Sequence, residues 1–112
     1  PVLLNGGPVI KINANERYAS DGGSAAVFQM LCRDCGIPFQ TYVHRNDLPC
    51  GSTIGPITAA RLGVRCVDVG NAMWSMHSAR EATGALDHIR MRTVLRQFYS
   101  RPRLPLTTGL QT

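Results

Sequence analysis

The sequence predicts an α/β domain with a mostly parallel, three-layer sheet and covering helices. Apolar, β-branched runs alternate along the chain with segments in which apolar residues recur at helical spacing. The chain has 112 residues, which is the length of one domain. The expected strands are residues 8–13, 39–43 and 64–69, and the expected helices are residues 24–35, about 53–62 and about 79–100.

The first strand and the first helix follow from local composition. Residues 8–13 are rich in apolar and β-branched side chains, which favours a strand. Between residues 24 and 35 the apolar side chains recur on one helix face. Gly36 and Pro38 end this helix, because glycine suits a helix C-terminus and proline cannot continue the helix.

The second half of the chain repeats this order of strand and helix. A short helix ends at Gly63, and the third strand follows it directly. Two apolar stripes between residues 82 and 98 predict one long helix. Prolines end that helix, and we expect residues 101–112 to form a flexible tail.

Composition and charge limit where we expect the protein to be located and which partners we expect it to bind. The chain shows no apolar run long enough for a membrane span and no signal-peptide pattern, so we expect a cytoplasmic protein that does not bind membranes. The net charge is +5, and arginines gather in the last third. Few aromatic residues lie among them, so we interpret them as a solvated helix face and expect no nucleic-acid partner.

The four cysteines are expected to be reduced thiols, most of them buried. Cys32 and Cys35 have the C-x-x-C spacing, but zinc sites usually add a second close pair, which is missing. The pair also falls at the end of a helix, where thioredoxin chemistry lacks its usual strand-to-helix context. Reduced thiols fit a reducing compartment.

Lys11 is the one lysine of the chain, and it lies inside the first expected strand. A lysine is a compact charge that can reach a small carboxylate from a confined wall, which indicates a functional role. A solvent-facing lysine at a strand edge explains the same pattern equally well. The residues alone leave both interpretations open.

Residues 50–56 form a second candidate site. Gly51 and Gly55 enclose two hydroxyl residues just before a helix, and such a loop could present backbone N–H groups to an anion or an oxyanion. The alternative is that Ser52 or Thr53 caps the helix. It is not a phosphate-binding P-loop, because no Lys-Ser/Thr pair follows the second glycine.

His77 lies within residues 70–81, the segment that we regard as central to the function of the chain. This stretch follows the third expected strand and leads into the longest expected helix. The C-terminal ends of strands are where α/β folds usually place chemistry, so His77 is a candidate metal ligand or proton carrier. The alternative is a loop histidine that caps the next helix.

Three motifs in this order resemble the aspartyl aminopeptidase family of zinc metallopeptidases. The first is Gly7-Pro-Val-Ile-Lys-Ile-Asn13, running on to Arg17-Tyr-Ala19. The second is Arg45-Asn-Asp47 followed by Cys50-Gly-Ser-Thr-Ile-Gly-Pro56, and the third is Met76-His-Ser-Ala-Arg-Glu81. The resemblance covers the chain from about Gly7 to Tyr99, with the motifs at about the spacing found in the family.

The resemblance implies a zinc-peptidase-like catalytic domain that releases acidic N-terminal residues, Asp or Glu, from peptides. In this family two metal ions act together, and the protein assembles as a large tetrahedral homo-oligomer. His77 matches the last of the family's metal ligands. Lys11 and Tyr18 match residues of the pocket for the acidic side chain, and Gly51, Ser52, Thr53 and Gly55 match the substrate-binding loop beside it.

The chain departs from the family pattern in what it lacks. A single histidine ligand, His77, cannot hold two metal ions. The family takes its other ligands and its general base from sequence upstream of the region matched here. Asp47, Asp68 and Glu81 do not stand in the family's ligand positions. We therefore expect residues 1–100 to be the C-terminal portion of the catalytic domain, inactive without the missing N-terminal part. The alternative function is a non-catalytic oligomerisation or interaction module.

Overall fold

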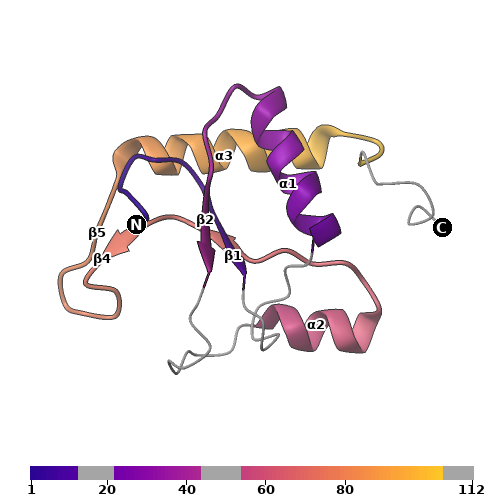
Figure 1. Ribbon diagram of the computed structural model, residues 1–112, viewed down its shortest axis with the longest axis horizontal. Coiled ribbons are helices and arrows are strands. Elements are labelled where there is room, and N and C mark those ends of the chain that lie inside the picture. The colour runs from indigo at the N-terminus through magenta and orange to yellow at the C-terminus, as the bar shows by residue number, and fades with distance from the viewer. Residues whose placement is uncertain (13–21, 44–53, 105–112) are drawn as a thin grey trace.

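The computed structural model describes residues 1–12, 22–43 and 54–104, which form a mixed α/β fold (Figure 1). In the described part, two small sheets are accompanied by three helices. The elements are β1 (Val9–Ile12), α1 (Gly22–Asp34), β2 (Gln40–Val43), α2 (Ile54–Leu62), β3 (Val69–Gly70), β4 (Met73–Trp74), β5 (Ala82–Thr83) and α3 (Ala85–Ser100). The α/β class predicted from the sequence is confirmed.

The main sheet has the strand order β2-β1-β3 and is mixed. β1 pairs with β2 in parallel, with Val9 opposite Gln40. β1 pairs with β3 in the antiparallel direction, with Ile10 opposite Val69. The mostly parallel, three-layer sheet expected from the sequence is therefore not confirmed.

The positions of the connecting helices explain the direction of β3. A parallel pair needs a crossover that carries the chain back to the end of the sheet where the first strand began. α1, with 13 residues, does this between β1 and β2. α2 has 9 residues and lies beyond the end of the sheet at which β1 and β2 finish (Figure 1). The chain consequently enters β3 from that same end, and its direction is reversed.

The hydrophobic core lies between β1 and the helices α1 and α3. Ile10 of β1 is fully buried and belongs to one cluster with Phe28, Leu31 and Cys32 of α1 and with Val94 of α3. The helical spacing of the apolar residues in α1 places them on the face that meets the sheet. These contacts hold the three elements together.

A buried polar clamp ties the N-terminal lead to the start of α3. The Asp87 carboxylate is fully buried and accepts hydrogen bonds from the backbone N–H groups of Asn5 (2.7 Å) and Gly7 (2.9 Å). The Asn5 side chain accepts from the Leu86 N–H at 3.1 Å, and the Asn5 carbonyl accepts from Arg90 at 2.7 Å. The clamp satisfies polar groups that would otherwise be costly to bury.

Residues 71–84 differ most from the sequence-based expectation. β4 and β5 pair in the antiparallel direction, with Trp74 opposite Ala82, and form a hairpin. The long helix was expected to begin at about residue 79, but α3 begins at Ala85, after the extended Gly84. Strands of two residues are too short to show an alternating pattern, so the apolar spacing predicts a helix over residues that form a strand. His77 consequently lies in a hairpin loop and not at a helix start.

The third strand is shorter than expected, and the end of the last helix agrees with the prediction. Of the expected strand 64–69, only the end pairs with β1, and the Asp68 carbonyl accepts a hydrogen bond from the Lys11 N–H at 2.9 Å. α3 ends at Ser100. Most of the predicted tail, residues 105–112, lies outside the described residues. In the part of the chain that is described, no helix is both long and apolar enough to span a membrane.

Candidate functional site

His77 lies exposed in the loop that joins β4 to β5. Its φ angle is +70°, in the left-handed region that residues with side chains seldom adopt. Its backbone N–H donates a hydrogen bond of 2.6 Å to the Glu81 Oε2. Among the described residues, the imidazole has no hydrogen-bond partner, so both ring nitrogens are accessible for chemistry.

The rest of the hairpin loop is held by its own short contacts. The Ser78 N–H donates to the Ser75 carbonyl at 3.0 Å, and Ser75 has a φ angle of +55°. The Ser78 hydroxyl donates to the Arg80 carbonyl at 2.8 Å and accepts from the Arg80 N–H at 3.2 Å. The loop therefore presents His77 from a compact, hydrogen-bonded turn.

Lys11 lies on β1, the central strand of the main sheet, and is half-buried. Its side chain passes over Gly70 of β3, with Cε and Nζ 3.4 and 3.5 Å from the position that a Cβ at residue 70 would take. Gly70 is three residues before β4 begins. The structure thus places the Lys11 side chain on the segment that leads into the hairpin of His77.

The other predicted substrate-binding residues are described only in part. Tyr18, Gly51, Ser52 and Thr53 lie outside the described residues. Gly55 is the second residue of α2. The choice between a helix cap and an anion-binding loop at residues 50–56 therefore stays open.

One of the described residues can serve as a metal ligand, but together they do not form a complete metal site. Among them there is no group of three or more His, Cys, Asp or Glu side chains that could hold an ion. His77 supplies an accessible imidazole, a donor that suits zinc. His88 is exposed on α3. A two-metal site on this chain would need ligands from elsewhere.

Two polar groups near the candidate site were not assigned from the sequence. Glu81 lies within the third motif, but its contact with the His77 backbone depends on the hairpin turn, which the periodicity did not predict. Asn71, between β3 and β4, has a buried Oδ1 without a hydrogen-bond partner among the described residues. Its position two residues after the end of the predicted third strand was the available signal.

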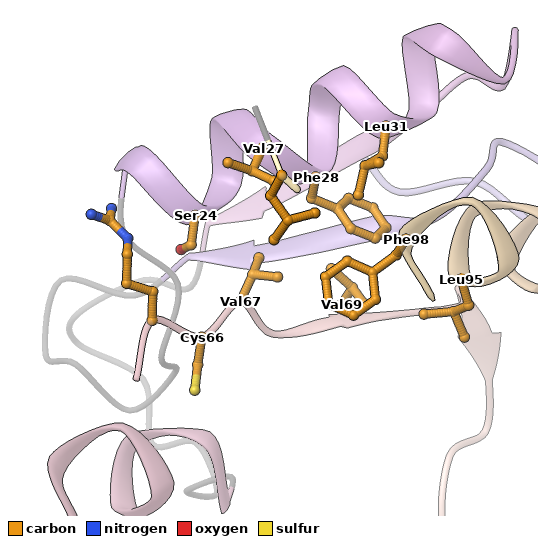
Figure 2. Close-up of a pocket in the computed structure, with 11 residues that line it drawn as sticks. Ser24, Val27, Phe28, Leu31, Cys66, Val67, Val69, Leu95 and Phe98 are labelled. Atoms are coloured by element: carbon orange, nitrogen blue, oxygen red, sulfur yellow. The ribbon is translucent and has the colours of Figure 1, made fainter. Parts of the chain in front are cut away.

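An apolar cavity of about 340 Å³ lies apart from these residues, between α1, the segment before β3 and the end of α3 (Figure 2). Val27, Phe28 and Leu31 of α1 face Leu95 and Phe98 of α3 across it. Neither His77 nor Lys11 lines it. The remaining lining residues are Ser24, Arg65, Cys66, Val67, Val69 and Leu104.

The described cysteines are unpaired thiols. Cys32 is fully buried, and Cys35 and Cys66 are half-buried. Burial, and secondarily the neighbouring Cys35, raises the pKa of the Cys32 thiol from 9.0 to about 11. A thiol with such a pKa is a poor nucleophile at neutral pH, which fits a structural role.

Comparison with known proteins shows that this chain is similar to a class of zinc metallopeptidases. The family model described as aminopeptidase I zinc metalloprotease (M18) matches residues 1–99. The chain therefore belongs to the M18 family. The resemblance drawn from the three sequence motifs is confirmed at the level of the family.

Curated relatives carry the same assignment. The chain is 53% identical over 102 residues to a probable M18 family aminopeptidase 2 of Azotobacter vinelandii, a match that covers 91% of this chain and 24% of the relative. It is 53% identical over 100 residues to the protein of the same name in Mycobacterium tuberculosis, covering 89% of this chain and 23% of that one. The chain thus spans about a quarter of the length of the curated relatives it matches.

Solved structures share the fold. Ape4, seen by cryo-electron microscopy in a complex with Nbr1, is 43% identical with a TM-score of 0.83, over 87% of this chain and 18% of that one. Yeast aminopeptidase 1 (Ape1) is 30% identical with a TM-score of 0.75, over 88% of this chain and 21% of that one. A further similar structure is a dodecamer of mApe1 from yeast, so this relative forms an oligomer.

Proposed function

We propose that this chain serves as part of the catalytic domain of an M18 metallo-aminopeptidase that releases acidic N-terminal residues, Asp or Glu, from peptides. Residues 1–100 would form the C-terminal portion of that domain, and residues 101–112 a tail. The observation that carries the proposal is His77. It is an accessible imidazole within the third motif, in a chain that matches the family over residues 1–99.

His77 would hold zinc as the last ligand of a two-metal site. The other ligands and the general base would come from the rest of a protein of family length, because the described residues offer no further cluster. Zinc bound there supplies Lewis acidity toward the substrate carbonyl. The task of this chain is to present the imidazole in a fixed orientation from the β4–β5 hairpin.

Lys11 would form the acidic-residue pocket together with Tyr18 and the loop residues Gly51, Ser52, Thr53 and Gly55. The half-buried Lys11 ammonium on the central strand suits a substrate carboxylate, because an unpaired carboxylate is costly to bury. A pocket built around such a pair favours acidic residues, because a neutral residue makes no ionic contact with the Lys11 ammonium.

The isolated chain would be inactive and would need the remaining part of a family-length protein as its partner. We further propose that the complete protein acts in the cytoplasm and forms a homo-oligomer. The dodecamer of the relative mApe1 supports the oligomer. The alternative is a non-catalytic oligomerisation or interaction module. Exposed apolar side chains on α2 and on the hairpin, such as Ile57 (58% exposed) and Trp74 (65% exposed), favour that alternative.

A hybrid protein tests the proposal. Residues 1–99 would replace the matching segment of the Azotobacter vinelandii relative, and hydrolysis of aspartyl, glutamyl, alanyl and leucyl chromogenic substrates would be measured with zinc. We expect the hybrid to hydrolyse the acidic substrates, and His77→Ala to reduce kcat by about a hundredfold or more because a metal ligand is lost. The 112-residue chain alone is expected to show no turnover.

Lys11→Met separates specificity from catalysis in the same hybrid. It keeps the length of the side chain and removes the charge, so kcat/KM should fall for acidic substrates and not for neutral ones. An active His77→Ala hybrid would disprove the ligand assignment. An unchanged preference in Lys11→Met would disprove the acidic pocket.

A further inference from the structure

We propose that Glu81 is a positioning residue, which holds the His77 backbone so that the imidazole is presented to the metal. The inference rests on the proposed role of His77 as a metal ligand, and it adds a residue whose role the sequence left unassigned. Glu81 is itself no ligand in this proposal. Its Oε2 accepts a 2.6 Å hydrogen bond from the His77 N–H.

The conformation of His77 needs such a support. With φ angles of +70° and +55°, His77 and Ser75 both occupy the left-handed region although both carry a side chain. Residues with side chains are strained there and keep this conformation only where the surroundings hold them. Strain of this kind gathers at functional sites, where it fixes the direction of a side chain.

Glu81 is the contact that acts on His77 itself. The other loop hydrogen bonds join Ser78 to Ser75 and Ser78 to Arg80, so they close the turn without engaging the His77 backbone. Glu81 directly precedes Ala82, which is paired with Trp74 in the hairpin. The carboxylate therefore reaches back from a fixed strand end, and its short hydrogen bond to an N–H is of the strong, charge-assisted kind.

The consequence for the metal is a pre-organised ligand. A histidine that already has its bound orientation binds metal more tightly than one that must be ordered, and groups that orient ligands typically contribute about 10–100-fold to metal affinity. The negative charge strengthens this hydrogen bond, but its geometry depends on an oxygen acceptor at the right distance, which a glutamine also supplies. This separates two substitutions: Glu81→Gln keeps the acceptor at the same reach, and Glu81→Asp keeps the charge but shortens the side chain.

The first measurement needs no metal. In ¹H–¹⁵N spectra of the 112-residue chain, we expect the His77 amide proton to resonate downfield because of its short hydrogen bond. The shift should disappear in Glu81→Ala and Glu81→Asp, and it should remain in Glu81→Gln but be smaller, because the glutamine acceptor is neutral. A His77 resonance that is the same in the original chain and in Glu81→Ala would overturn the proposal. The remaining amide resonances show whether each variant is folded.

The second measurement is zinc affinity of the hybrid protein with the Azotobacter vinelandii relative, determined by competition with a chelator. We expect Glu81→Ala and Glu81→Asp to lower the affinity about tenfold or more, and Glu81→Gln about threefold or less. Ser78→Ala is the matched control, because it removes a side chain–backbone hydrogen bond of the same loop that does not involve His77. It should change the affinity less than Glu81→Ala does.

The outcomes distinguish this proposal from the one on which it rests. If His77→Ala binds zinc as the unaltered hybrid does, the ligand assignment fails and Glu81 has no ligand to position. If His77→Ala loses zinc and Glu81→Ala does not, only the positioning role fails. If Glu81→Asp retains zinc and Glu81→Gln loses it, the effect is one of charge, and the positioning proposal is overturned.

Discussion

Two regions of the molecule differ in how far their apolar residues are buried. In the packed half, formed by β1, α1 and α3, Leu31 is 2% exposed and Val94 is fully buried. On the open side, formed by α2 and the β4–β5 hairpin, Leu62 is 70% exposed. Both regions are apolar in sequence, and it is the packed half that holds the buried cluster, although Leu86, Ile89 and Tyr99 on the outer side of α3 are exposed as well.

The difference shows which part of the chain supplies its own stability. The packed half has a buried core and the Asp87 clamp. α2 lies beyond the end of the sheet (Figure 1), and its Ile54, Ile57 and Leu62 are exposed. Exposed apolar surface of this kind commonly marks an interface. It fits the proposal that the rest of a family-length protein packs on the open side.

A pair of identical substitutions provides the largest test of this comparison. Leu31→Ala should lower the free energy of unfolding by about 3 kcal/mol, because it leaves a cavity in a buried cluster. Leu62→Ala in α2 should lower it by less than about 0.5 kcal/mol, since the side chain is already in water. Urea denaturation of both variants measures the difference. Equal losses would show that α2 is packed in solution.

The buried clamp should have the next largest effect. Asp87→Ala leaves the N–H groups of Asn5 and Gly7 without their acceptor, which should destabilise the chain by about 2 kcal/mol. Asp34→Ala is the control, because it removes a partly exposed ion pair with Arg101. Such surface pairs contribute about 0–1 kcal/mol. Thermal melts that rank the two variants the other way would contradict the assigned importance of the clamp.

The smallest expected effect concerns Cys32 and pH. Its pKa in the folded chain is about 11, above the ordinary 9.0, so the unfolded chain loses this proton first as pH rises. Stability should therefore fall between about pH 9 and pH 11, and this part of the fall should be absent in Cys32→Ala.

Alkylation of the thiols tests the same pKa directly. At pH 9 the half-buried Cys66 should react with iodoacetamide at least about tenfold faster than the buried Cys32, because the thiolate is the reacting form. Equal rates would show that Cys32 is accessible and that the packed half opens readily in solution.

Much of the packed half was predictable because its signals are local. The predicted helix 24–35 corresponds to α1 at Gly22–Asp34, and the predicted strands 8–13 and 39–43 correspond to β1 and β2. Thirteen residues of α1 are enough for apolar spacing to show clearly. α2 at Ile54–Leu62 also agrees with the expected helix, although its exposure could not be read from its apolar composition.

The sequence indicated which residues to consider for the candidate site, but it did not predict how they are arranged in space. The third motif indicated His77, and the structure places it in a loop with an accessible ring. The hairpin around it was missed, because two-residue strands carry no periodic signal. In the expected helix, Glu81 would have occupied the first turn, and its contact with the His77 backbone would not have been foreseen.

The sequence by itself determined the α/β class, the helices and first two strands, and the motifs that place the chain in the M18 family. These depend on the spacing of neighbouring residues, which the chain carries locally. Only the tertiary structure decided the reversed direction of β3, the Asp87 clamp and the left-handed conformation of His77. The clamp joins residues 80 to 85 positions apart, and the direction of β3 depends on the position of α2 beyond the end of the sheet. The closing of the hairpin brings Glu81 to the His77 backbone, and no local pattern specifies such an arrangement in space.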